Sequence, residues 1–205
     1  MRKLLLTTAA VAAAICLAGC SKKPAQEAVS ITYDTLTDKR DGQKYRTVKM
    51  PDGKTWMAQN LNYRTDSSWC YENRADSCNK YGRLYAWDAA KKACPAGWKL
   101  PDTADWRKLV TAAGSEDEAG RKLKAKSGWN ENGNGTDDYG FSTLPGGGRN
   151  SDGSFYYAGN NGFGWTATEL VDNLAYFRLM YYHVGYVFEN YYLKSYGLSV
   201  RCVND

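Results

Sequence analysis

The stretch LPDTADWRKLVTAAG, residues 100–114, predicts a helix and is the strongest local signal in the chain. Its apolar side chains share one helical face at the i, i+3, i+4 and i+7 spacing: Trp106, Leu109, Val110 and Ala113. Asp102 or Thr103 can cap the N-terminus, and Gly114 follows the last apolar residue as a stop signal. An amphipathic helix of this kind must bury its apolar face against another element.

Working outward, the rest of the chain alternates between helical and strand patterns. We expect two short strands around a turn at residues 51–53, a helix over 81–93, a short helix over 117–124, and strands over 174–182, 186–192 and 196–203. Residues 127–165 are rich in Gly and Asn and predict long structured loops joined by short strands. These elements together predict an α+β fold.

Alternation along the strand 174–182 divides its side chains between two faces. The face expected in the core carries Ala175, Phe177, Leu179 and Tyr181. The face expected at the surface carries Tyr176, Arg178, Met180 and Tyr182. In the last strand, Tyr196, Leu198, Val200 and Cys202 are expected to point inward, and Ser199 and Arg201 outward.

The N-terminus predicts export. Arg2 and Lys3 precede an apolar run over residues 4–17, which is shorter than the roughly 20 residues of a membrane-spanning helix. The following LAGC resembles the lipobox of bacterial lipoproteins, in which the chain is cut before the cysteine and that cysteine, here Cys20, is lipidated. The alternative is an ordinary signal peptide in which Cys20 has no role.

These features predict the domain organisation. We expect a lipoprotein signal peptide over 1–19, a lipidated cysteine and flexible tether over 20–43 that enters the fold near Ile31 at the earliest, and one domain over 44–205. Ser21 after the cysteine favours anchoring in the outer membrane, with the domain facing the periplasm or the exterior. Loss of Arg2 and Lys3 lowers the net charge from +5 to +3, which is too mild to indicate nucleic-acid binding.

The cysteine content of the mature chain predicts disulfides. Four cysteines remain after Cys16 and Cys20 are set aside: Cys70, Cys78, Cys94 and Cys202. An even number in an exported protein favours two disulfides, and three pairings are open. The alternative is a metal site, but no CxxC or Cys/His spacing is present.

Several phrases occur in the order of a known family: KTWMAQNLNY, YGRLYAWDAAKKACPAGWKLPDTADWRKLV, KSGWNENGNGTDDYGFSTLPGGGRNSDGSF and KSYGLSVRCV. Over residues 45–203 the chain resembles the Fibrobacter succinogenes major paralogous domain, a family of exported bacterial domains that brings no established activity with it. More distantly, WKLPDTADWRKL, FGWTATE and YGLSVRCV resemble the formylglycine-generating-enzyme branch of the C-type lectin fold. This second resemblance implies two helices packed on small antiparallel sheets, chain ends close together, and the pairs Cys94–Cys202 and Cys70–Cys78.

No motif predicts catalysis, and we expect a protein that is not an enzyme. The formylglycine-generating enzymes use a cysteine pair, and none is spare here if all four are bridged. His183, the only histidine, lies in a predicted hairpin turn. Asp137, Asp138 and Glu169 are candidate carboxylates for an exported polysaccharide-acting enzyme, but nothing in the sequence fixes their separation.

The segment NENGNGTDD is a weak candidate for Ca²⁺ binding. Its oxygen-bearing side chains are Asn132, Asn134, Asp137 and Asp138. An EF-hand loop counted from Asn130 would need a glutamate at its twelfth position, where this chain has Phe141. The alternative is an Asn-Gly turn cluster with self-capping side chains. We therefore expect no cofactor, with Ca²⁺ as the weaker alternative.

Tyrosine, tryptophan and asparagine are abundant, a mixture that suits rigid aromatic contacts with adaptable hydrogen bonds. We expect a binding face built from the loops 159–169 and the strands 176–192. The candidate ligand-binding residues are Trp165, Tyr176, Arg178, Tyr182, Tyr186, Asn190 and Tyr192. The sequence thus predicts a surface-anchored, non-catalytic binding or adhesion domain for a polysaccharide or another surface protein. A structural envelope lipoprotein is the alternative, and an enzyme the weaker one.

Overall fold

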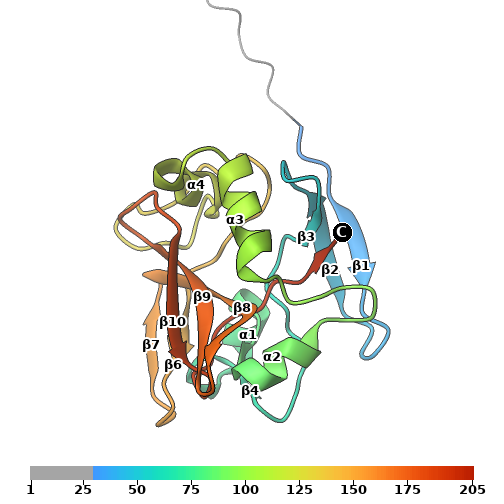
Figure 1. Ribbon diagram of the computed structural model, residues 1–205, viewed down its shortest axis with the longest axis vertical. Helices are drawn as coiled ribbons and strands as arrows, with labels where there is room; N and C mark the ends of the chain where they lie inside the picture. The colour runs from blue at the N-terminus through green and yellow to red at the C-terminus, as the bar shows by residue number, and fades with distance from the viewer. Residues whose placement is uncertain (1–29) are drawn as a thin grey trace, which may run out of the picture. The chain divides into compact units, whose positions relative to one another are not determined.

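The helix predicted within residues 100–114 is α3, Thr103–Ala112, in a computed structural model that describes residues 30–205 (Figure 1). The Asp102 carboxylate accepts a hydrogen bond from the backbone N–H of Asp105 at 2.8 Å. In return, the Asp105 carboxylate accepts one from the backbone N–H of Asp102 at 3.1 Å. This capping box satisfies two N–H groups that the start of a helix leaves without partners. The predicted signal peptide and Cys20 lie outside the described residues.

The other elements are mostly short. The helices are α1 (Ala75–Tyr81), α2 (Trp87–Ala93) and α4 (Glu116–Leu123), with a 3₁₀ turn η1 at Tyr71–Asn73. The strands are β1 (Asp34–Thr37), β2 (Lys44–Lys49), β3 (Thr55–Met57), β4 (Ser68–Trp69), β5 (Leu84–Tyr85), β6 (Gly146–Arg149), β7 (Phe155–Ala158), β8 (Asn161–Val171), β9 (Leu174–Tyr181), β10 (Phe188–Leu193) and β11 (Val203–Asn204). Within residues 30–205, no helix has the length and apolar character to cross a membrane.

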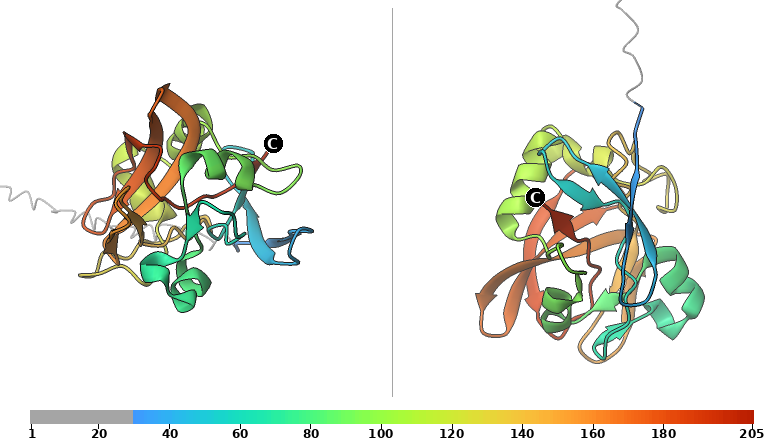
Figure 2. Two further views of the ribbon diagram at one scale, coloured as in Figure 1. Left: turned by 90° about the horizontal axis from the view of Figure 1, so that it is seen from below. Right: turned by 90° about the vertical axis from the view of Figure 1, so that its right-hand side faces the viewer.

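The strands form small antiparallel sheets that do not close into a barrel. One sheet has the order β1-β2-β3-β11 and another the order β10-β9-β8, while β4-β5 and β6-β7 form pairs. Figure 2 shows the first two sheets on different sides of the unit formed by residues 31–205. This arrangement confirms the predicted α+β class. The finer likeness to C-type lectins stays a prediction.

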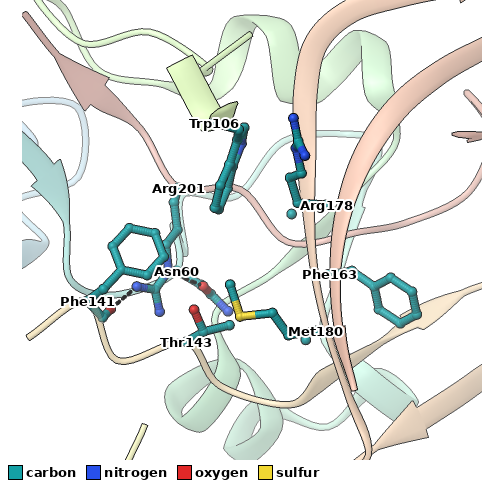
Figure 3. A pocket seen from close by; sticks show the side chains of 10 residues that line it. Asn60, Trp106, Phe141, Thr143, Phe163, Arg178, Met180 and Arg201 are labelled. Carbon is teal, nitrogen blue, oxygen red and sulfur yellow. Dashed lines mark hydrogen bonds between the residues drawn. The ribbon is translucent and has the colours of Figure 1, made fainter. Parts of the chain in front are cut away.

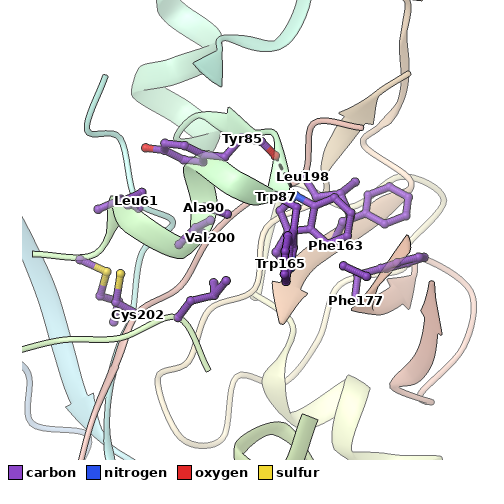
Figure 4. Packing of buried hydrophobic residues seen from close by; sticks show 14 of the residues in the cluster. Leu61, Tyr85, Trp87, Ala90, Phe163, Trp165, Phe177, Leu198, Val200 and Cys202 are labelled. Atoms are coloured by element: carbon purple, nitrogen blue, oxygen red, sulfur yellow. Dashed lines mark hydrogen bonds between the residues drawn. The ribbon is translucent and has the colours of Figure 1, made fainter. Parts of the chain in front are cut away.

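The sheet β10-β9-β8 separates two hydrophobic clusters. On one face, Phe177 of β9 and Trp165 of β8 pack with Trp87 of α2 and with Leu198 (Figure 4). On the opposite face, Met180 belongs to a second cluster with Trp106 of α3. Each face of β9 therefore packs against a different cluster.

The second cluster overturns part of the predicted surface face of β9. Arg178 and Met180 were expected at the surface, but they are buried. The reason is that α3 lies over this face, and the carbonyl of Thr103 accepts a hydrogen bond from Arg178. Alternation along one strand identifies two faces but does not show that a helix from elsewhere covers the polar one.

The last segment was also predicted incorrectly. Residues 196–203 form isolated bridges, such as Tyr85 with Leu198, rather than a continuous strand, and β11 is confined to Val203–Asn204. Ser199 and Arg201, expected to point outward, are both buried. Arg201 donates to the carbonyls of Phe141 and Ser142, so a loop covers the face that alternation predicts to be exposed.

The helix expected over residues 81–93 is interrupted. Helix α1 ends at Tyr81, β5 follows at Leu84–Tyr85, and α2 begins only at Trp87. Gly82 has φ +73°, and a Cβ there would lie 2.8 Å from the carbonyl oxygen of Leu61. The chain therefore leaves the helix at the one residue that tolerates this close backbone approach.

The predicted tether extends too far toward the domain. The compact unit begins at Ile31 rather than at residue 44. β1 pairs along its length with β2, from Asp34 opposite Thr47 to Thr37 opposite Lys44. Residues 31–43 therefore belong to the fold, and a fragment starting at residue 44 would lose an edge strand.

Both disulfides have the pairing implied by the C-type lectin resemblance. Cys70 is bonded to Cys78, and Cys94 to Cys202. The first closes a short loop around η1 and α1. The second joins the end of α2 to the C-terminal segment across 108 positions of sequence.

Candidate functional site

The residues predicted to bind a ligand do not form one surface. Trp165 is fully buried in the first cluster, and its Nε1 donates to the carbonyl of Tyr85 at 2.7 Å (Figure 4). Its place as a ligand contact was wrong, because no part of the ring reaches solvent. In FGWTATE, Trp165 lies among small residues. In the structure, these small neighbours leave room for its ring in the core.

Arg178 is also placed inside the protein. Its guanidinium pairs with Glu189 of β10, which in turn pairs with Arg107 of α3 at 2.5 Å. Burial lowers the pKa of Arg178, and the charge of Glu189 opposes this shift. The side chain joins β9, β10 and α3, so its position favours a role in packing over direct contact with a ligand.

Tyr182 and Tyr186 lie near α4, away from the other candidates. Tyr186 Oη donates to the carboxylate of Glu116 at 2.8 Å. Tyr182 lines a groove of about 360 Å³ together with Arg121, Lys124, Glu131, Asn132, Gly133, Asn134, His183, Val184 and Gly185. Its neighbour His183 is exposed in the turn that the sequence predicted, with its ring 4.6 Å from that of Tyr182.

Lys124 anchors this turn and was not recognised from the sequence. Its Nζ donates to the carbonyls of Tyr181, Tyr182 and Val184 at 3.1, 3.0 and 3.2 Å. Burial lowers the pKa of the ammonium to about 8. A lysine after a short helix carries no sequence signal that distinguishes this role from solvent exposure.

We expect Lys124 to make stability increase with pH between about 8 and 10.5. In that window the unfolded chain holds a proton on Lys124 that the folded protein has released, so the free energy of unfolding rises by up to about 3 kcal/mol. Denaturant titrations of wild type and Lys124→Met at pH 7, 8.5 and 10 measure the difference. The same pH dependence in both proteins would contradict this assignment.

The remaining candidates occupy the two faces of the hairpin formed by β9 and β10. Tyr176 lies opposite Tyr191, with ring centroids 6.4 Å apart. Leu174 lies opposite Leu193 on the same face. Tyr192 and exposed Asn190 point to the other face, where Tyr192 stacks on Phe177 at 4.4 Å.

Tyr192 belongs to a continuous series of rings, which we call the tyrosine row: Tyr157, Tyr156, Tyr196 and Tyr192. Successive ring centroids are 5.3, 6.4 and 4.8 Å apart. The row begins on β7 and ends on β10, at one end of the unit (Figure 1). Burial raises the pKa of Tyr156 and of Tyr192, so these rings remain neutral at physiological pH.

Tyr157 is the most exposed ring of the row, at 58%. Its φ is +61°, a left-handed conformation that costs a bulky residue about 1–2 kcal/mol. Gly147 lies opposite it in β6, and a Cβ on Gly147 would be 2.4 Å from the carbonyl oxygen of Tyr156. The fold thus holds an aromatic side chain outward in a strained conformation, and such strain is concentrated at functional sites.

Sequence reasoning missed most of the tyrosine row. Tyr156 and Tyr157 were not singled out, and Tyr196 was expected to point into the core, whereas it is half-buried. The available signal was the aromatic pair in SFYYAGNNG, placed beside glycine and asparagine in a predicted loop region. Tyr192 was the one residue of the row that the sequence selected.

A second groove lies between β2 and α1. Its volume is about 370 Å³, and its lining is rich in amide and basic side chains: Gln43, Lys44, Arg46, Gln59, Asn60, Asn62, Asn79 and Lys80. No carboxylate lines this groove. Such a surface can form many hydrogen bonds with a polar ligand, but its exposed cations are also the ordinary composition of a solvated surface.

Asp137, Asn134 and Glu169, which were considered for catalysis or Ca²⁺ binding, have other partners. Both oxygens of Asp137 accept hydrogen bonds from Ser142, from its backbone N–H at 2.7 Å and its hydroxyl at 2.5 Å. Asn134 accepts one from the backbone N–H of Trp129 at 3.1 Å. Glu169 pairs with Lys194 at 2.5 Å. Asn134 and Asp137 thus cap backbone groups of a local turn, and Glu169 forms an ion pair.

One pair of carboxylates shares a groove. Asp102 and Asp105 line a groove of about 360 Å³ together with Lys99, and both form the capping box of α3. The pKa of Asp105 is lowered: burial opposes the shift, but Lys54, the backbone N–H of Asp102 and Lys99 outweigh it. A general acid needs a raised pKa, which Asp105 does not have, and the capping box shows both carboxylates holding the N-terminus of α3.

The fold and its surfaces define an α+β domain with two disulfides and a partly exposed tyrosine row. The chain belongs to the Fibrobacter succinogenes major domain family, whose model matches residues 45–204. The predicted family is thereby confirmed. Comparisons with curated proteins and with solved structures find no significant match.

Proposed function

We propose that this protein is an envelope-anchored, non-catalytic binding domain and that the tyrosine row binds a polysaccharide. The observation that carries the proposal is Tyr157, held outward at a strained φ of +61° at the end of a continuous series of rings. Flat aromatic faces present rigid apolar area to a ligand at low cost in conformational entropy. Asn190, exposed on the same face of the β9–β10 hairpin as Tyr192, adds hydrogen-bonding capacity.

The anchoring part of the proposal rests on sequence. The LAGC motif and the apolar run before it support lipidation of Cys20, and Ser21 supports the outer membrane. A lipid anchor with two or more acyl chains would hold the domain stably at a membrane. Ile31, where the compact unit begins, leaves a short connection from Cys20 to the fold.

We expect Tyr157→Asn to weaken polysaccharide binding about tenfold or more while leaving the protein folded. Truncating an aromatic contact residue commonly costs binding more than 1 kcal/mol, and asparagine tolerates the left-handed conformation better than tyrosine. The measurement is retention of purified full-length protein on a panel of insoluble plant and cell-wall polysaccharides. Denaturant unfolding of the same variant should show unchanged or increased stability.

The matched control is Tyr191→Asn, which removes another exposed ring, from the face of the β9–β10 hairpin opposite to Tyr192. Polysaccharide binding should survive this change. Absence of retention on every polysaccharide tested, or equal loss in the two variants, would refute the role of the tyrosine row.

A protein partner is the second candidate, and a specific apolar patch favours it. Val171, Tyr191 and Leu193 are large, exposed residues at the end of the sheet where β8 turns into β9 and where β10 ends. β10 is also an edge strand. If this patch binds another surface protein, cross-linking on cells should yield one dominant product that Tyr191→Asn abolishes and Tyr157→Asn preserves.

A further inference from the structure

The guanidinium of Arg83, two residues after the end of α1, contacts the Cys70–Cys78 disulfide. Its Nη1 lies 3.6 Å from the Sγ atoms of both cysteines. Its Nε donates to the hydroxyl of Ser68 and its Nη2 to the carbonyl of the same residue, each at 2.9 Å. Because these two hydrogen bonds orient the planar guanidinium, β4 determines the position of Nη1 beside the sulfurs.

The contact with sulfur distinguishes Arg83 from another buried arginine. Arg201 donates to oxygens, including those of Asn60 and Phe141 (Figure 3). Arg83 is half-buried, and within residues 30–205 it forms no ion pair. Burial lowers its pKa, but an arginine remains charged in proteins, and Arg64 adds a further positive charge nearby. A partly desolvated cation of this kind favours an anion at its Nη1.

Reduction of the disulfide would supply that anion. A positive charge stabilises a thiolate, and a stabilised thiolate leaves faster in thiol–disulfide exchange. Cys70 is half-buried and Cys78 is buried, whereas residues 72–76 between them are exposed. An incoming thiolate can therefore reach the sulfur of Cys70, and Cys78 would leave as a thiolate beside Nη1 of Arg83.

We propose that Cys70–Cys78 is a thiol–disulfide exchange site for a protein dithiol, with Arg83 as the residue that stabilises the leaving thiolate. A thiolate of the dithiol attacks Sγ of Cys70, which breaks the Cys70–Cys78 bond and forms a mixed disulfide. The second thiol of the dithiol then displaces Cys70. Two electrons pass to the protein, and the dithiol departs as a disulfide. Of its two protons, one is taken up by Cys70 and the other by solvent.

The Cys94–Cys202 disulfide does not meet these conditions. Cys202 is fully buried in the first cluster, so an incoming thiolate can reach only the half-buried Cys94. Cys202 would then have to leave as a thiolate among apolar side chains, which disfavour the charged form. Reduction by a dithiol should therefore be confined to Cys70–Cys78 while the protein remains folded.

The loop closed by Cys70–Cys78 supports the tyrosine row. Tyr71 of η1 packs against Phe155 of β7, with ring centroids 5.3 Å apart. A Cβ on Gly147, which lies opposite Tyr157, would be 2.8 Å from Cε2 of Tyr71. Next to Tyr71, Glu72 has φ +52°, a conformation that persists only where the surrounding structure enforces it. Reduction should therefore loosen η1 and the backbone that holds Tyr157. Its effect on polysaccharide binding rests on the proposed function.

The first test measures reduction of each disulfide in the purified full-length protein. The protein is incubated with graded dithiothreitol, free thiols are alkylated, and each cysteine is quantified by mass spectrometry. We expect half-labelling of Cys70 and Cys78 at a dithiothreitol concentration about tenfold or more below that for Cys94 and Cys202. Labelling of all four at the same concentration, or of Cys94 and Cys202 first, would overturn the proposal.

Arg83→Gln removes the cation and should slow the reduction of Cys70–Cys78 about three- to tenfold. Arg83→Lys retains the charge and should recover part of the rate. Arg74→Gln is the matched control, because Arg74 is an exposed arginine of the same loop whose side chain makes no capping hydrogen bond. This control should be reduced at the wild-type rate. Equal rates for wild type and Arg83→Gln would refute the role of Arg83.

Hydrogen exchange tests the link to the tyrosine row without any ligand. After selective reduction and alkylation of Cys70 and Cys78, the backbone amides of η1 and of residues 155–158 should exchange faster, and those of β1 and β2 should not change. Unchanged exchange at residues 155–158 would refute the link. Retention on polysaccharide should fall in the same sample. If the oxidised protein binds no polysaccharide, the proposed function fails, whereas the labelling experiment still decides whether Cys70–Cys78 is an exchange site.

Discussion

Replacing both Cys94 and Cys202 by alanine is expected to lower the free energy of unfolding by about 4–5 kcal/mol. The bond joins residues 108 positions apart, and the entropy that a cross-link removes from the unfolded chain increases with loop length. Cys202 is fully buried in the first cluster, so the substitution also removes packing there. Equilibrium unfolding in guanidinium chloride, followed by tryptophan fluorescence, measures the change.

The control is the other disulfide, replaced in the same way at Cys70 and Cys78. Its eight-residue separation predicts a loss of only about 2–3 kcal/mol. A loss from the Cys70–Cys78 replacement as large as that from the Cys94–Cys202 replacement would show that loop closure does not govern either effect.

Trp165→Ala is expected to destabilise the protein by about 3–5 kcal/mol, the usual cost of removing a large buried aromatic side chain. The ring packs edge-on against Phe177, with centroids 6.2 Å apart, and its Nε1 donates to Tyr85. Trp165→Phe retains most of the ring volume and loses the hydrogen bond, so it should cost about 1–2 kcal/mol. Denaturant unfolding of the two variants checks this order.

Binding measurements on Trp165→Phe separate the core role from the predicted ligand contact. If Trp165 acts only in packing, the folded variant should bind polysaccharide as wild type does, whereas Tyr157→Asn should lose binding and retain stability. Weakened binding by Trp165→Phe, with the fold intact, would restore Trp165 as a ligand-binding residue.

Short stretches of sequence correctly predicted the helices and turns that are determined by residues close together in the chain. The capping residues and apolar spacing of α3 appear within one short stretch, and so do the turn residues between β2 and β3. Helix α4 was expected one residue late, at 117 rather than Glu116. In each case the residues that determine the element are neighbours in sequence.

The predictions of exposure were wrong where segments distant in sequence cover one face of a strand. Arg178 and Arg201 follow a polar–apolar alternation that predicts exposure, yet α3 and the loop at Phe141–Ser142 bury them. Both arginines have long apolar stems and find backbone carbonyls as partners. One strand carries no information about which helix or loop will lie over it.

The tyrosine row could not be predicted from local sequence patterns for a related reason. Tyr157 owes its exposure to a left-handed backbone opposite Gly147, and the row is completed by Tyr192 and Tyr196 from a later part of the chain. Composition indicated that aromatic side chains would exceed the needs of a core. Which of them assemble on one surface depends on the pairing of β7 and β10 with their neighbours, which no local pattern specifies.

Because β9 contributes Phe177 to one hydrophobic cluster and Met180 to the other, neither cluster can lose its packing without removing support from the other. The same division runs through β3, where Trp56 and Met57 enter different clusters, and through Cys202 and Val203. Residues 31–205 should therefore melt in a single cooperative transition, with equal calorimetric and van't Hoff enthalpies. A substitution that destabilises either cluster would then lower the melting temperature of the whole domain instead of unfolding one half locally.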